Sequence, residues 1–180
     1  MKISAKLLVL FITVTTIISG IFYLRVSAQD AVLTSQQTEQ IIGNCTILKN
    51  TLNQLHSSDA LLRVNMGQLY ELVSTKLMDR FNKRISSNNF KIDNLTLAYN
   101  TYNSNLNNFR SDYITYEESL TTAIKIDCKS QPSVFYNSLL AARYNRGRVY
   151  EDVKKLNQQI DQYRLAMTQF EKDFQAMGNK

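Results

Sequence analysis

The chain has few of the residues that interrupt regular structure, with one proline and five glycines among 180 residues. Sandwiches and barrels of short strands need frequent turns, so this scarcity argues against an all-β fold. Tryptophan is absent and His56 is the only histidine. No glycine-rich phosphate loop, nucleophile elbow or metal-ligand spacing occurs. We therefore expect a non-enzymatic protein with no metal and no cofactor.

The first 28 residues have the features of a targeting segment. Lys2 and Lys6 precede an almost continuous apolar run over 7–24, and a small-residue cleavage site ends at Ala28. The run approaches the roughly 20 residues that span a bilayer, so both a cleaved signal peptide and a retained signal anchor stay open. In either case residues 29–180 are predicted to form one extracytoplasmic domain, secreted or held at the membrane by the uncleaved segment.

Excess charge of one sign is also small in the exported part. The whole chain carries a formal net charge of +6, but residues 1–28 contain three basic residues and no acid, which leaves 18 basic against 15 acidic residues. A mild excess spread along the chain lacks the concentrated basic face of a nucleic-acid binder. We do not expect nucleic acid as a partner.

Apolar residues recur at alternating steps of three and four in three stretches, which predicts three long helices at about 34–85, 91–126 and 133–177. In the first stretch this apolar seam includes Cys45, Asp59, Leu62 and Leu69, and after Val73 it changes to steps of four. Such a change resembles a stutter, which locally relaxes supercoiling.

Short polar links separate these stretches, Ser86 to Asn89 and the segment around Pro132. Helices joined by short links pack as antiparallel neighbours, because each narrow seam needs partners to leave water. The predicted fold is all-α, an elongated antiparallel three-helix coiled-coil bundle preceded by the N-terminal signal or anchor helix.

The two cysteines fall where this fold would bring them together. If the first link centres near Asn88, Cys45 lies level with a position near 130, close to Cys128. In an oxidising compartment, two cysteines so placed predict a disulfide, with free buried thiols as the alternative.

The same calculation places Asp59, Tyr116 and Arg146 at one level of the three seams. An acid, a phenol and an arginine at one level can satisfy one another, which predicts a buried polar layer that sets helix register. The alternative is that Asp59 and Arg146 lean out to solvent from a slightly rotated seam.

The densest basic cluster, around Arg143 and Arg148, suggests either a site for an anionic partner or cross-helix ion pairs. The calculated levels favour ion pairs, of Arg143 with Glu117 and of Arg148 with Asp112. His56 is interpreted as a solvated helix position.

A possible contact site lies where the first link and the carboxyl terminus should meet. Arg80 and Arg84 lie there beside Phe90, interpreted as an exposed aromatic. A partner-binding tip explains this grouping, although helix C-termini also attract cations through the helix dipole.

Architecture alone does not identify function. The leading hypothesis is an exported scaffold, spacer or adhesion element of the cell envelope, with a protein or envelope polymer as partner. The alternatives are an extracytoplasmic holdase chaperone, for which the chains could self-associate, and a ligand-sensing bundle whose site is the polar layer.

Overall fold

The computed structural model describes residues 32–178, and this part of the chain is all-helical with no strand. The expected leader over residues 1–28, with its cleavage site, lies outside the described residues. Among the helices of residues 32–178, none combines the length and apolar character needed to cross a bilayer. The elements are α2 (Ser35–Gly43), α3 (Cys45–Leu72), the π-helix η1 (Val73–Met78), α4 (Asp79–Ser87), α5 (Asp93–Lys125) and α6 (Pro132–Gly178).

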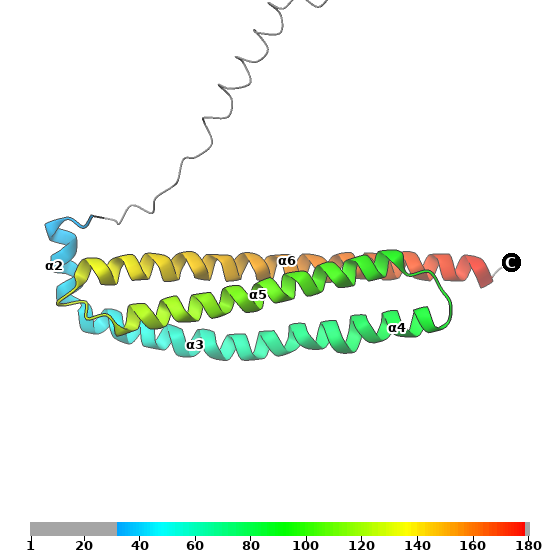
Figure 1. Ribbon diagram of the computed structural model, residues 1–180, viewed down its shortest axis with the longest axis horizontal. Coiled ribbons are helices and arrows are strands. Elements are labelled where there is room, and N and C mark those ends of the chain that lie inside the picture. The colour runs from blue at the N-terminus through cyan, green and yellow to red at the C-terminus, as the bar shows by residue number, and fades with distance from the viewer. Residues whose placement is uncertain (1–31, 179–180) are drawn as a thin grey trace, which may run out of the picture. The chain divides into compact units, whose positions relative to one another are not determined.

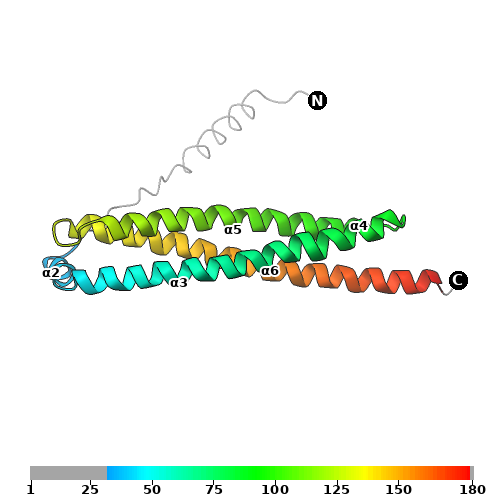
Figure 2. The same ribbon diagram turned by 90° about the horizontal axis from the view of Figure 1, so that it is seen from below.

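Three long helical segments lie side by side within the described residues (Figures 1 and 2). The first consists of α3, η1 and α4 in continuous sequence, the second is α5, which runs in the opposite direction, and the third is α6. The 47 residues of α6 extend for about 70 Å at the α-helical rise. The closest packing is between α5 and α6, whereas α3 packs mainly on α5 and its backbone comes near that of α6 at few points.

The helix expected from residue 34 is divided at Asn44. Its side-chain amide and its backbone N–H both donate to the Gln40 carbonyl, at 2.9 and 3.1 Å. Asparagine competes in this way with the regular helical ladder, so α2 ends and α3 begins in a new direction. α2 therefore turns aside at one end of the long segments (Figure 1).

The π-helix η1 begins at Val73, where the apolar pattern changes step. Buried residues from α3 to α4 then follow steps of four, namely Tyr70, Ser74, Met78 and Asn82. In an α-helix such a row drifts by about 40° per step. A turn with i→i+5 bonds holds more residues and takes up this drift, as in the bond from the Asp79 N–H to the Ser74 carbonyl.

This shift corrects one part of the predicted seam. Leu69, which the three-and-four pattern places inside, and Leu77, which the steps of four after Val73 place inside, are about half exposed, at 50% and 51%. Their neighbours Tyr70 and Met78 are buried instead. The π turn rotates the buried face by one residue, which accounts for Met78 in place of Leu77. Tyr70 precedes the turn and is buried against Phe109.

Two buried phenols from the other helices brace this segment. The Tyr102 hydroxyl of α5 donates to the Tyr70 carbonyl at 3.0 Å, and the Tyr163 hydroxyl of α6 donates to Asn82 Oδ1 at 2.7 Å. Burial raises the pKa of both phenols, so both remain neutral donors at ordinary pH. The irregular turn is therefore held by its neighbours.

The two links follow local rules. After α4, Asn89 adopts a left-handed conformation at φ 61°, which asparagine tolerates better than most residues. Before α6, the Asp127 carboxylate accepts bonds from the Lys129 N–H and the Ser130 hydroxyl. Pro132 then opens α6 at the first helical position, where its missing N–H costs nothing.

Candidate functional site

The structure joins Cys45 and Cys128 in a disulfide with their Cα atoms 5.6 Å apart. The pair packs with the buried Phe135 and lies at the start of α3, beside the link between α5 and α6. This covalent bond joins the start of the first helical segment to the link between α5 and α6. The level calculation from the sequence predicts this pairing.

Asp59, Tyr116 and Arg146 also meet. The Tyr116 hydroxyl donates to Asp59 Oδ2 at 2.6 Å, and Arg146 donates to both Asp59 oxygens at 2.9 and 3.2 Å. Tyr116 is buried and the Asp59 side chain is 12% exposed, but the Arg146 side chain is 54% exposed. The layer thus combines both interpretations, because the phenol and acid lie inside while the guanidinium reaches solvent.

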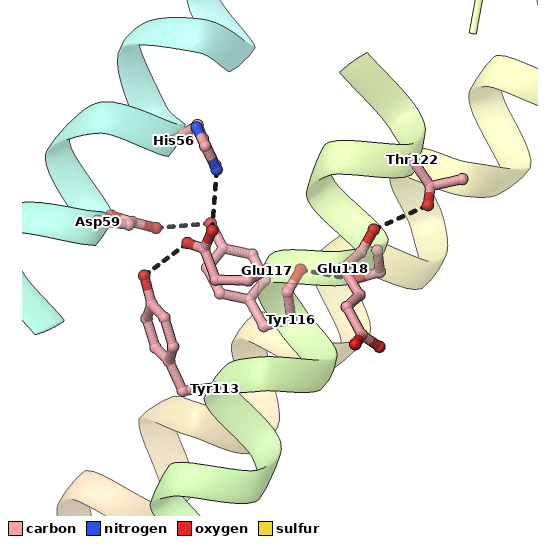
Figure 3. Close-up of polar contacts among 8 residues, drawn as sticks. His56, Asp59, Tyr113, Tyr116, Glu117, Glu118 and Thr122 are labelled. Atoms are coloured by element: carbon pink, nitrogen blue, oxygen red, sulfur yellow. Dashed lines mark hydrogen bonds and ion pairs between the residues drawn. The ribbon is translucent and has the colours of Figure 1, made fainter. Parts of the chain in front are cut away.

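A second polar group adjoins this layer (Figure 3). His56 Nε2 lies 2.8 Å from Glu117 Oε2, and the Tyr113 hydroxyl donates to Glu117 Oε1 at 2.5 Å. The interpretation of His56 as solvated is therefore incomplete, because its side chain is 37% exposed and also pairs with Glu117. The predicted pair of Glu117 with Arg143 is also absent, because Glu117 already serves two other groups.

A groove runs between α3 and α6 and has α5 as its floor. Its volume is about 550 Å³. One wall comes from α3, the floor from α5 and the other wall from α6. The lining residues are Asp59, Leu62, Arg63, Met66, Tyr70, Phe109, Tyr113, Tyr116, Arg143, Arg146, Gly147, Val149, Tyr150 and Val153. The groove exists because α3 approaches α5 more closely than it approaches α6.

Much of the apolar lining stays open to solvent. Leu62, which the sequence pattern assigns to the seam, is 59% exposed. Phe109 closes the floor and stacks edge-on against Tyr70, with ring centroids 5.6 Å apart. The Tyr70 hydroxyl is buried beneath the groove and has no hydrogen-bond partner within the described residues. An apolar floor with few polar groups is typical of ligand sites.

Two arginines on opposite walls have no carboxylate partner in the part of the chain that the structure describes. Arg63 lies with its guanidinium carbon 4.8 Å from the centre of the Tyr113 ring, a cation–π contact. Arg143 is exposed and forms no ion pair. The neighbouring Arg148 does pair with Asp112, at 2.6 Å, as the sequence predicts.

Gly147 lies between these groups on α6. A Cβ atom added there would have no heavy atom within 4 Å. Packing therefore does not require glycine at this position, and a mid-helix glycine costs up to about 1 kcal/mol relative to alanine. Because glycine has no side chain, the α6 wall of the groove stays open at this position.

The predicted contact tip is only partly as expected. Arg80 and Arg84 are exposed on α4. Phe90, however, is half-buried and packs edge-on against Phe170 and Phe174, with centroids 6.0 and 5.3 Å apart. The interpretation of Phe90 as an exposed contact residue is wrong, because α6 continues past the link and covers it.

A pair of carboxyl groups between α5 and α6 was not found from the sequence. Asp152 is buried, its Oδ1 lies 3.3 Å from Lys155 Nζ, and its Oδ2 has no partner among the described residues. Burial raises the pKa of Asp152, and the adjoining Asp112 carboxyl raises it further. The positions of Asp112 and Asp152 in the sequence place both at one level of α5 and α6, and this is the signal from which the pair could have been predicted.

Across residues 32–178, no three His, Cys, Asp or Glu side chains gather in a way that could hold a metal ion. No family model matches the chain, and no match was found among curated proteins or solved structures.

Proposed function

We propose that this protein is an exported, non-enzymatic binding protein that holds a ligand in the groove between α3 and α6. The helical segments would form an antiparallel three-helix coiled coil that follows a signal peptide or signal anchor. Among the functions that the sequence allows, this is the ligand-binding bundle. The observation that carries the proposal is the groove, which combines open apolar lining with two arginines that lack carboxylate partners within the described part of the chain.

A spacer needs only closed contacts along its length. Here the contact of α5 with α6 is closed, but α3 leaves apolar surface such as Leu62 open beside α6. Exposing such surface is unfavourable by roughly 25 cal/mol per Å² that could otherwise be buried. A ligand that covers the groove would recover this free energy.

Location outside the cytoplasm is supported by two features. The first 28 residues have a basic lead, an apolar run and a small-residue cleavage site. The second is the pairing of Cys45 with Cys128, because disulfides persist mainly in oxidising compartments.

The test uses Gly147→Leu, which adds bulk on the α6 wall. The position has free space and leucine is a better helix former than glycine, so the variant should fold at least as stably. Binding is followed with the apolar fluorescent dye Nile red and the oxidised full chain. We expect the wild type to bind the dye and Gly147→Leu to lose most of that binding.

Gly67→Leu is the matched control. Gly67 also lies in a helix with free space around it, but it lines a different hollow, between α3 and α5. This variant should keep the binding of the wild type. No dye binding by the wild type, or equal loss in both variants, would overturn the proposal.

A spacer or adhesion role is the second candidate. It is favoured by the length of α6 and by the disulfide that ties one end of the segments. Loss of partner binding in Arg80→Gln/Arg84→Gln, with dye binding unchanged, would support it.

A further inference from the structure

Building on the proposed function, we propose that the ligand of the groove is a free long-chain carboxylate, with its head group at Arg63 and Arg143 and its chain along the apolar floor. The charge, the length and the volume of the groove each favour such a ligand.

The charge of the lining favours an anion. Three arginines and one aspartate line the groove, which leaves a net charge of +2. The aspartate, Asp59, already accepts hydrogen bonds from Arg146 and Tyr116. Arg63 and Arg143 therefore remain as cations without a carboxylate among residues 32–178, and a guanidinium binds a carboxylate through charge-assisted hydrogen bonds.

The shape of the lining favours a chain. Between Asp59 and Tyr70 the α3 wall rises by about 16 Å. Since Arg146 meets Asp59, Arg63 lies level with position 150 of α6. Beyond that level the groove is lined by Met66, Tyr70, Phe109 and Val153. The apolar end of the groove thus follows Arg63 along the helix axis. This arrangement matches an amphiphile with one polar head and one extended tail.

The volume decides between a small amphiphile and an acidic amphipathic helix. A helix 16 Å long and 10 Å wide would occupy on the order of 1,300 Å³. The groove holds about 550 Å³, within the range of about 300–1,000 Å³ that small-molecule sites have. A single chain fits this space, whereas a helix would lie mostly outside it.

The experiment measures displacement of Nile red by three soluble amphiphiles with the same chain, each kept below its micelle concentration. Laurate carries a carboxylate, dodecylamine an ammonium group, and dodecyl maltoside a neutral head. We expect laurate to bind most tightly and dodecylamine to bind most weakly, because the cation meets the unpaired arginines.

The decisive variant is Arg63→Gln/Arg143→Gln. Hydrogen bonds to charged groups contribute enough that losing them should weaken laurate binding between about tenfold and a hundredfold. Dodecyl maltoside should bind the variant as it binds the wild type. Arg84→Gln, which removes an exposed arginine on α4, is the control and should bind laurate normally.

Three outcomes would overturn this inference. One is equal affinity for the three head groups, another is laurate binding unchanged in Arg63→Gln/Arg143→Gln, and the third is binding to anionic vesicles without binding of soluble laurate. In each case Nile red binding that is lost only in Gly147→Leu would leave the proposed function standing. Failure of the wild type to bind any of these probes would remove both.

Discussion

Replacing Asp59 with alanine should destabilise the protein more than removing either of its partners. Asp59 is the acceptor for both the Tyr116 hydroxyl and the Arg146 guanidinium. Without it, Tyr116 keeps a buried hydroxyl with no acceptor, which costs about 1–3 kcal/mol. Arg146 is more than half exposed and can return to water, so its lost ion pair costs at most about 1 kcal/mol.

The expected loss for Asp59→Ala is therefore about 1–4 kcal/mol in the free energy of unfolding. For a chain of this size each kcal/mol shifts the melting temperature by about 2–4 °C, so the shift should be roughly 2–16 °C. Arg146→Leu should cost about 1 kcal/mol or less, because Asp59 then still accepts from Tyr116. Urea unfolding followed by circular dichroism measures these differences.

A double-mutant cycle separates the two contacts. Tyr116→Phe should be destabilising in the wild type, but neutral or stabilising in Asp59→Ala, because it removes the unsatisfied hydroxyl. The Asp59–Tyr116 coupling should exceed that of Asp59 with Arg146. Additive effects of Asp59→Ala and Tyr116→Phe, or a larger cost for Arg146→Leu than for Asp59→Ala, would refute this reasoning.

Three further predictions concern the disulfide and the titrating groups. Replacing Cys45 and Cys128 with alanine should lower the free energy of unfolding by about 4.5 kcal/mol, because the disulfide closes a loop with a sequence separation of 83. Urea unfolding of the oxidised protein and of the variant would show whether the loss is that large. Asp152→Asn should stabilise the protein at neutral pH by about 1 kcal/mol through a new bond to Asp112. Thermal melts should show this gain disappearing towards pH 4, because the raised pKa of Asp152 penalises only its ionised form. A gain that persists at low pH would contradict this explanation. Burial raises the pKa of four core tyrosines in the folded state, namely Tyr102, Tyr113, Tyr116 and Tyr163. The free energy of unfolding should therefore keep its full value below about pH 10 and fall above it. A free energy of unfolding that stays constant to higher pH would be inconsistent with buried phenols.

Local sequence rules account for the helical class and for the links. Scarce proline and glycine with apolar residues at steps of three and four predict helices, and the described residues are helical. The link at Asn88 and the start of α6 at Pro132 follow from the preferences of single residues. Such signals are readable because each depends on only a few neighbouring positions.

The sequence pattern predicts where the helices lie better than it predicts which residues of each helix are buried. The predicted seam assigns Leu69 and Leu77 to the interior, but Tyr70 and Met78 are buried instead, and the π turn accounts for the second of these exchanges. The change of step after Val73 marked the place of this irregularity, although not which residues would turn inward. Tyr102 of α5 and Tyr163 of α6 donate their hydroxyls to the Tyr70 carbonyl and to Asn82, so the choice depends on contacts with the other helices.

By itself, the sequence determined which residues share a level, since the rise per residue of antiparallel helices is constant. Cys45 with Cys128, Asp59 with Tyr116, and Arg148 with Asp112 all follow from that regularity.

Only the tertiary structure decided how far apart the helices lie around each level. Because α3 stands off from α6, Leu62 is exposed. Because His56 and Tyr113 engage Glu117, Arg143 is left without its expected partner. The separation of two helices depends on the shapes of all the side chains between them, and a periodic pattern along one chain does not contain that information.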